Sequence, residues 1–193
     1  MKRNFIFTNN WFERNINISM KLLQTMFKDN KVDILEIGSH EGASTVWMLE
    51  NLCNANGSTF TSIDPYLTDD KTSPVTSQTY QNFCHNISIC KNKEKLTQYV
   101  ALSQDILPKL VKKGKLFDII YIDGSHQEDD VLFDLINADI LIRSGGVILM
   151  DDVGFDWDKT EGVVGALKRF LLNSSGDYQL ILKEYQCALQ KVD

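Results

Sequence analysis

The sequence predicts an α/β protein: one Rossmann-like domain whose seven-stranded, mostly parallel sheet carries helices on both faces and ends in an antiparallel strand. Three observations favour this fold. Segments with strand and helix patterns alternate along the chain, as in parallel βαβ units. The strand segments are almost continuously apolar, as expected for strands buried on both faces. The 193 residues are enough for one sizeable core, and no Pro/Gly/Ser-rich linker divides them.

The first elements follow from local patterns. Residues 16–28 place apolar side chains mostly at helical spacing. Val32–Ile37 is a short apolar strand, and residues 43–52 after it predict a helix. Thr59–Ile63 is rich in β-branched residues, which favours a strand, and residues 78–90 predict another helix.

The middle of the chain continues the alternation. Residues 65–77 hold two of the three prolines and several turn-forming residues, so we expect a long loop there. Tyr99–Leu102 is a weakly patterned strand, and residues 104–112 are expected to be helical. Phe117–Ile122 is a strongly apolar strand, and residues 127–141 follow it with apolar positions at helical spacing.

The last elements complete the sheet. Val147–Met150 is a short apolar strand, and residues 162–172 predict a helix. Residues 178–183 and 186–192 predict a final pair of strands. Such a pair at the end of a parallel sheet accounts for the antiparallel strand.

Composition and charge narrow the class of protein. The formal net charge of −6 disfavours a general binder of nucleic acid or anionic membrane, because those proteins present basic faces. No apolar run reaches the roughly 18 residues of a membrane span, and the N-terminus has no signal-peptide pattern. The four cysteines show neither CxxC nor zinc spacing, so we expect reduced thiols in a cytoplasmic protein. The sequence leaves the oligomeric state open, a homo-oligomer included.

Residues 1–193 are expected to form a single domain, with residues 1–30 as a helical N-terminal segment. Trp11 and Phe12 in this segment could form a lid over a ligand. The alternative is that they pack into the core or against another chain.

Polar residues stand where four of the predicted strands end. They are Gly38, Asp64, Asp123 and the pair Asp151–Asp152. Ligands of open α/β sheets bind outside the carboxyl ends of the strands, so we expect these residues at the binding site.

The first of these turns reads EIGSHEG. Gly38 and Gly42 allow a sharp turn into a helix and close approach of a ligand. His40 replaces the middle glycine of the pyrophosphate-binding pattern G-x-G-x-x-G, and Glu36 adds a negative charge, so a neutral or cationic ligand is favoured. Asp64 could accept hydrogen bonds from both hydroxyls of a ribose. The alternative is an ordinary turn with a strand-end aspartate.

These motifs carry a resemblance to a known family. EIGSHEG, IDPY, FDIIYIDGSHQEDDVLFDL and GGVILMDDV, in this order, resemble the class I S-adenosylmethionine-dependent methyltransferases. The chain is most similar to the small-molecule O-methyltransferases with an IDGSH motif, which include macrolide-sugar methyltransferases, and more distantly to the catechol type. The similarity spans roughly residues 30–170.

The resemblance implies roles for individual residues. Glu36, Gly38 and Gly42 would line the methionine end of the cofactor, and Ser39 and His40 could touch its amino-acid part. Asp64 would hold the ribose. Gln104 and Asp105 would contact the adenine, although SQD departs from the usual small residue before the acid. Asp123 is expected both to contact the cofactor and to take part in catalysis.

The acids after the fourth and fifth strands predict a metal site. In this fold these strands are neighbours, about 4.8 Å apart, so Asp123, Asp151 and Asp152 would converge and repel one another. Mg²⁺ or another divalent cation prefers such oxygen ligands and could activate a substrate hydroxyl. The alternative is Asp123 as a loop cap and Asp152 as a single lining residue.

A general base is expected at His126, three residues after Asp123. Histidine titrates near neutral pH, and the IDGSH relatives have histidine at this offset. Ser125 and Glu128 instead form the pattern of a capping box for the following helix. That pattern does not account for His126, for which a surface position is the alternative.

The sequence therefore predicts an enzyme that transfers a methyl group from S-adenosylmethionine to a hydroxyl of a small molecule, with assistance from a divalent metal. Two alternatives remain. One is a nicotinamide-dependent Rossmann oxidoreductase, which shares the glycine turn and the ribose aspartate. The other is a catalytically inactive binding protein with the methyltransferase fold. The sequence does not identify the methyl acceptor.

Overall fold

The computed structural model describes residues 3–67, 77–154, 156–174 and 178–192. Of the loop expected at 65–77, residues 68–76 lie outside this described part. The sheet has seven strands in the order β3-β2-β1-β4-β5-β7-β6. The strands are β1 Asp33–Ile37, β2 Thr59–Ile63, β3 Leu96–Tyr99, β4 Phe117–Ile122, β5 Ile142–Met150, β6 Tyr178–Lys183 and β7 Cys187–Lys191.

The predicted topology is confirmed. Strands β1 to β5 pair in parallel, and β7 runs antiparallel to both β5 and β6. The helical elements are α1 Glu13–Asn15, the π-helix η1 Ile16–Met20, α2 Lys21–Phe27, α3 Ala43–Asn51, α4 Gln78–Ile89, the 3₁₀-helix η3 Lys93–Lys95, α5 Ser103–Lys112, α6 Glu128–Leu141 and α7 Gly162–Ser174. Among the described residues no helix has the length and apolar character needed to cross a membrane.

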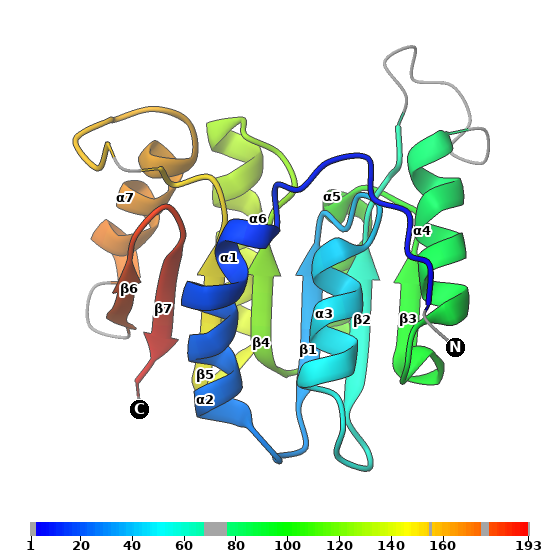
Figure 1. Cartoon of the computed structure of the whole chain (residues 1–193). Helices are drawn as coiled ribbons and strands as arrows, with labels where there is room; N and C mark the ends of the chain where they lie inside the picture. Colours follow the sequence, from blue (N-terminus) through cyan, green and yellow to red (C-terminus); the bar gives the residue numbers. More distant parts are fainter. Residues whose placement is uncertain (1–2, 68–76, 155, 175–177, 193) are drawn as a thin grey trace.

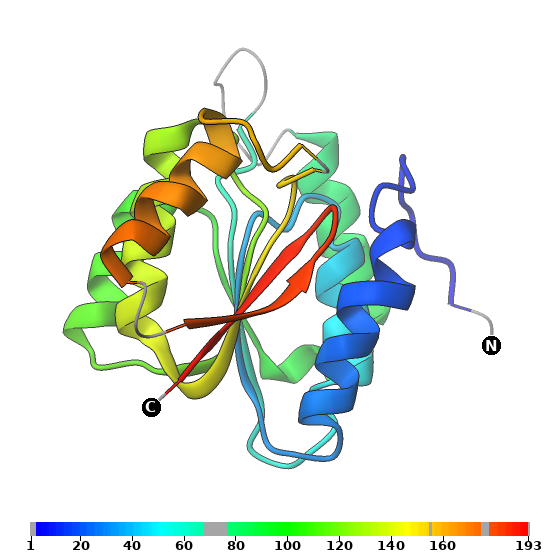
Figure 2. The same cartoon turned by 90° about the vertical axis from the view of Figure 1, so that its left-hand side faces the viewer.

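Helices cover both faces of the sheet, as Figures 1 and 2 show. On one face α2 and α3 pack on side chains such as Ile34, Ile119 and Leu149. On the other face α5, α6 and α7 pack on side chains such as Leu35 and Ile120. Because each central strand is buried on both sides, the near-continuous apolar runs of β1, β4 and β5 are explained.

Two strands differ from the prediction by more than one residue at an end. Strand β3 is Leu96–Tyr99, not Tyr99–Leu102. It is the edge strand of the sheet and only half-buried, so its sequence LTQY carries little apolar signal, while the apolar Leu102 lies in the exposed connection to α5. Strand β5 begins at Ile142 rather than Val147, because the register with β4 shifts around Gly145 and Gly146 and the strand continues through the irregularity.

The carboxyl ends of β1, β2, β4 and β5 lie at one edge of the sheet, drawn at the top of Figure 1. In Figure 1 the chain N-terminal to α1 crosses above α3 toward α4 at the same edge. This edge is where the sequence places its candidate site.

Candidate active site

A cavity of about 930 Å³ opens over the carboxyl edge of the sheet. Its size suits a cofactor-sized ligand. The predicted site residues on its lining are Gly38, Ser39, His40, Asp64, Gln104, Asp123, His126, Asp151 and Asp152. Glu36, Gly42 and Asp105 are not on the lining.

The glycine turn after β1 depends on its first residue. Gly38 has φ +86°, and a Cβ there would lie 1.9 Å from the backbone oxygen of Asp123. The turn of β1 and the end of β4 therefore touch backbone to backbone, which no other residue type allows. Gly42, with φ +83°, is the N-cap of α3, and a Cβ there would meet the ring of Phe83 at 3.0 Å.

Asp64 holds this glycine turn in place. Its Oδ2 accepts hydrogen bonds from the backbone N–H groups of Ser39 (2.9 Å) and His40 (2.8 Å), and its Oδ1 accepts one from Tyr66 (2.7 Å). These bonds fix His40 in the left-handed region at φ +45°. Burial raises the pKa of Asp64, although the three hydrogen bonds favour its charged form. Oδ1 keeps a second lone pair, whereas both lone pairs of Oδ2 are used, and the predicted contact with the ribose stays a prediction.

Glu36 lies beneath the cavity rather than on its lining, which corrects the expected placement. It is fully buried, and its two oxygens accept hydrogen bonds from Ser44 Oγ and Thr45 Oγ1, each at 2.5 Å. Burial raises its pKa to about 7. Glu36 therefore ties the first turn of α3 to β1.

Of the two residues predicted to contact the adenine, one lines the cavity and the other does not. Gln104 lines the cavity and donates to Asp130 Oδ1 at 3.1 Å, whereas Asp105 is exposed in the first turn of α5 and is not on the lining.

Asp134 of α6 also lines the cavity, and sequence reasoning missed it. It is 1% exposed, and its Oδ1 meets no donor within the described residues. Burial raises its pKa to about 7. The available signal was its position three residues after Val131, on the apolar face of the helix.

The acids at the ends of β4 and β5 do converge. Tyr121 Oη donates to Asp151 Oδ2 at 2.5 Å and lies 3.1 Å from Asp123 Oδ2. Burial, and then the charges of Asp151 and Asp152, hold the pKa of Asp123 well above its usual range.

Asp151 is embedded in neutral donors. Besides Tyr121, its Oδ2 accepts from Asn15 Nδ2 (3.1 Å) and Gln186 Nε2 (2.9 Å), and its Oδ1 accepts from the backbone N–H of Asp152 (2.8 Å). Sequence reasoning missed Asn15 and Gln186, because they lie far from the strand-end motifs and carry no local signal. Through Asn15 and Gln186, Asp151 links the N-terminal helix to the turn between β6 and β7.

Asp152 faces the cavity and pairs with His126. The two lie after neighbouring strands, and His126 Nε2 is 2.7 Å from Asp152 Oδ2. Tyr185 Oη donates to Asp152 Oδ1, and Arg14, which stacks on the Tyr185 ring at 3.7 Å, reaches Asp152 at 4.0 Å. Asp152 has φ +55°, a left-handed conformation that aspartate tolerates better than most residues.

The predicted capping box is not formed. The N-cap of α6 is Gln127, and no side chain caps the helix there. Ser125 Oγ accepts from the Gln127 N–H (3.1 Å) and donates to Asp130 (2.8 Å), while Glu128 pairs with Arg169 (2.9 Å). Ser125 therefore stabilises the loop before α6, and Glu128 joins α6 to α7 through an ion pair. His126 makes neither contact and lines the cavity.

The predicted metal ligands fit a cation only in part. Within the described residues no group of three or more His, Cys, Asp or Glu side chains is arranged to hold a metal ion. Asp151 Oδ2 already accepts three hydrogen bonds and has no lone pair left for a cation, whereas its Oδ1 accepts one, from the N–H of Asp152. Asp123 and Asp152 face the cavity and accept fewer hydrogen bonds than Asp151, so these two of the three predicted ligands suit a divalent cation best.

The sequence of the chain is similar to a known family and to one curated protein. A family model described as "Methyltransferase domain" matches residues 35–153, more than half of the chain. An uncharacterized protein of Acanthamoeba polyphaga mimivirus is 26% identical over 146 residues, which cover 74% of this chain and 62% of that protein. The chain thus spans under two thirds of the length of this curated relative.

Solved structures share the fold. The O-methyltransferase TomG from Streptomyces achromogenes, in complex with S-adenosylmethionine, has a TM-score of 0.69 at 18% identity and covers 93% of this chain and 80% of its own. An O-methyltransferase from Bacillus cereus, in complex with S-adenosylhomocysteine, has a TM-score of 0.68 at 18% identity, covering 97% and 85%. MycE of the mycinamycin pathway, with Mg and S-adenosylhomocysteine, has a TM-score of 0.62 at 14% identity, covering 97% and 51%.

At these identities the likenesses show the class I methyltransferase fold, and they give no support to a nicotinamide-dependent oxidoreductase.

Proposed function

The chain belongs to the methyltransferase domain family, and from this premise we propose that it is an S-adenosylmethionine-dependent O-methyltransferase acting on a hydroxyl of a small molecule. One observation carries the reaction type. The His126–Asp152 pair stands on the same cavity as the Gly38 turn and Asp64, so a base and a cofactor loop face one space.

The cofactor end of the cavity suits a cationic nucleoside. Asp64 and Asp123 line it, and Glu36 lies just beneath. A sulfonium is favoured beside these carboxyl groups because its charge stabilises their ionised forms, whereas a pyrophosphate would be repelled by them. Solved structures of the same fold hold S-adenosylmethionine or S-adenosylhomocysteine, which supports this choice.

The chain's own residues then have three tasks. The Gly38 turn and Asp64 fix the walls against which the cofactor binds, which is positioning without covalent chemistry. His126 accepts the proton of the acceptor hydroxyl as its oxygen attacks. Asp152 holds the imidazole through Nε2 and stabilises the imidazolium that forms.

The cofactor supplies an electrophilic methyl group on sulfur. The products are S-adenosylhomocysteine, the methyl ether of the acceptor and one proton, which leaves His126 for solvent through its exposed face. The side chain of His126 is 66% exposed, so it can exchange protons with water between turnovers.

Divalent-metal assistance is a further part of the proposal. Asp123 and Asp152 would hold the cation, which when bound would polarise an acceptor oxygen and lower its pKa. Burial raises the pKa of Asp123 first and the charges of Asp151 and Asp152 raise it further, and a cation would relieve this repulsion.

A direct assay tests the function. The protein is incubated with methyl-labelled S-adenosylmethionine and a panel of phenols, catechols, sugars and hydroxylated natural products, and S-adenosylhomocysteine release is measured. The proposal expects label on an acceptor oxygen. Cofactor binding without turnover on any acceptor would favour the inactive binding protein instead.

A further inference from the structure

The N-terminal strap, residues 3–12, forms one wall of the cavity. Phe7, Trp11 and Phe12 of the strap line the cavity, and the Trp11 ring lies 5.5 Å from the ring of His40 in the cofactor turn. In Figures 1 and 2 this segment passes outside α3 on its way toward α4. The strap and the cofactor turn are therefore adjacent parts of one site.

Glu41 joins the strap to the cofactor turn. It lies between Ser39 and Gly42, and it is 3% exposed. Its Oε2 accepts the backbone N–H of Thr8 at 2.6 Å, and its Oε1 accepts Thr8 Oγ1 at 3.0 Å and Asn82 Nδ2 at 2.7 Å. Three donors, two of them from the strap, converge on one carboxylate.

Asn86, one helical turn after Asn82 in α4, adds further hydrogen bonds to the strap. Asn86 accepts the N–H of Ile6 and donates to its carbonyl, both at 2.7 Å, and also donates to the carbonyl of Glu41 at 2.8 Å. The strap backbone is therefore clamped at residues 6 and 8, directly beside the cofactor turn.

Apolar packing holds the strap only in part, through Phe5 and Phe12, which pack against the core cluster. A second cavity of about 680 Å³ lies on its other side and is lined by Phe5, Phe7, Phe12 and Trp47. Phe7 is 39% exposed and Trp11 is 65% exposed. With open space on both sides, the polar contacts decide where the strap lies.

We propose that Glu41 is a positioning residue for the cofactor: its carboxylate couples the strap to the Gly38–Gly42 turn, so that closure of the strap and cofactor binding stabilise each other. This inference rests on the proposed function, in which that turn binds S-adenosylmethionine. Coupling of this kind is reciprocal, so the factor by which the docked strap tightens cofactor binding equals the factor by which the cofactor favours docking.

The charge of Glu41 supports this role. Burial raises its pKa, but the hydrogen bonds from Thr8 and Asn82 outweigh burial and hold the pKa below its usual value. The clamp is thus ionised at neutral pH. A glutamine offers one acceptor oxygen and an NH₂ group, so it cannot satisfy three donors.

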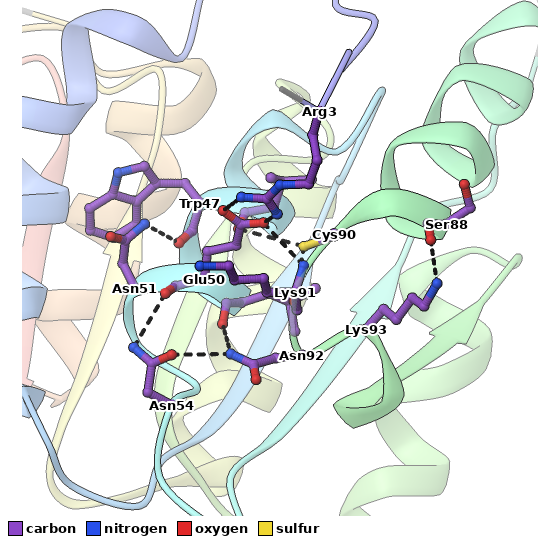
Figure 3. Close-up of polar contacts among 12 residues, drawn as sticks. Arg3, Trp47, Glu50, Asn51, Asn54, Ser88, Cys90, Lys91, Asn92 and Lys93 are labelled. Carbon is purple, nitrogen blue, oxygen red and sulfur yellow. Dashed lines mark hydrogen bonds and ion pairs between the residues drawn. The ribbon is translucent and has the colours of Figure 1, made fainter. Parts of the chain in front are cut away.

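Glu50 provides the matched control. It also binds the strap, through Arg3, with Arg3 Nη2 at 2.9 Å from Oε2, but it stands at the far end of α3 from the cofactor turn. Figure 3 shows Arg3 directed onto Glu50 beside Cys90 and Lys91. Glu50→Gln weakens a contact at the start of the strap and leaves the hydrogen bonds at Ile6 and Thr8 beside the turn in place.

The test measures S-adenosylhomocysteine affinity by calorimetry and amide hydrogen exchange of residues 6–8 with and without this ligand. In the wild type, the ligand is expected to slow exchange at Thr8 at least fivefold. In Glu41→Gln, Kd is expected to rise at least fivefold and the ligand-dependent protection to disappear. Glu50→Gln should keep Kd within twofold of wild type.

Thr8→Val and Thr8→Ser guard against misfolding of the Glu41 variant. Valine keeps the backbone bond and removes the hydroxyl, so Kd should rise about two- to threefold, and serine should restore it. Equal Kd for wild type and Glu41→Gln, or no ligand-dependent protection of the strap, would overturn the inference while the proposed function stands. No binding of the ligand by the wild type would overturn the proposed function and the inference with it.

Discussion

The imidazole Nε2 of His126 lies 2.7 Å from Oδ2 of Asp152, although the two residues follow different strands of the sheet. The contact exists because β4 and β5 are parallel neighbours, so their carboxyl ends reach the same edge. The left-handed backbone at Asp152 directs its side chain toward His126 and Tyr185 rather than toward the donors around Asp151. A base and the carboxylate that orients it thus arise from two ordinary strand ends.

Substituting either member of this pair should reduce turnover. His126→Gln is expected to lower kcat about 10²- to 10⁴-fold, the range for loss of a general base. Asp152→Asn should also lower kcat, and the double variant should lose little more than His126→Gln alone, because the two act as a unit. Steady-state kinetics with the identified acceptor check this. Asparagine tolerates the backbone at 152, so S-adenosylhomocysteine affinity should stay within threefold; additive losses would show that the residues act separately.

The tyrosine between the acids should matter for stability. Tyr121→Phe removes a buried hydroxyl that donates to Asp151 and contacts Asp123. Leaving a buried carboxylate short of one donor is expected to cost about 1–3 kcal/mol of unfolding free energy. Urea denaturation with an unchanged m-value measures it. A loss under 0.5 kcal/mol would mean that Asp151 tolerates the missing donor.

Gly38 is predicted to accept no side chain. Gly38→Ala places a Cβ 1.9 Å from the Asp123 carbonyl oxygen at φ +86°, so the turn must open. We expect strong destabilisation together with loss of S-adenosylhomocysteine binding. Gly114→Ala is the control, because Gly114 has φ +62° but nothing within 4 Å of its Cβ position. It should cost only the backbone strain, about 1 kcal/mol. Equal effects of the two variants in thermal unfolding and calorimetry would contradict the close approach.

Glu36 makes a specific contribution to the pH dependence of stability. Its folded pKa, about 7, lies above its unfolded value, so the native state binds more protons between these values. Stability from the protonated form is complete below the unfolded pKa and is lost as pH rises through about 7. The loss is on the order of 3 kcal/mol. Glu36→Gln should remove this contribution, so that the unfolding free energy falls less between pH 5 and 8 than in the wild type. Denaturant titrations at several pH values measure it. An unchanged slope would mean that Glu36 is ionised in the folded protein.

Removal of metal tests the two-carboxylate site. Dialysis against EDTA should lower turnover and Mg²⁺ should restore it, while S-adenosylhomocysteine binding stays the same. Asp123→Asn should weaken the response to Mg²⁺, because it removes one of two candidate ligands. Turnover that is indifferent to EDTA in the wild type would discard metal assistance and leave deprotonation to His126 alone.

The sequence predicted the sheet well because its signals are local and strong. Central strands such as Phe117–Ile122 and Thr59–Ile63 have the bounds expected. The edge strand β3 was misplaced because half-buried strands have no continuous apolar run. The residues at strand ends were found because topology brings them to one edge.

What the sequence could not give were contacts decided by packing. Glu36 was expected on the lining, but nothing in EIGSHEG tells that Ser44 and Thr45 will hold it beneath. Asp151 was expected as a metal ligand, but Asn15 and Gln186, which are distant in the chain, donate hydrogen bonds to its Oδ2. The partner of His126 was also unforeseen, because Asp152 follows a different strand.

The most direct test of the account is a calorimetric titration of the wild-type protein with S-adenosylhomocysteine, with NAD⁺ as the comparison ligand. We predict saturable binding of one S-adenosylhomocysteine per chain, weakened by Asp64→Ala, and no binding of NAD⁺. Binding of NAD⁺ in place of S-adenosylhomocysteine, or binding that Asp64→Ala leaves unchanged, would contradict the assignment of this cavity.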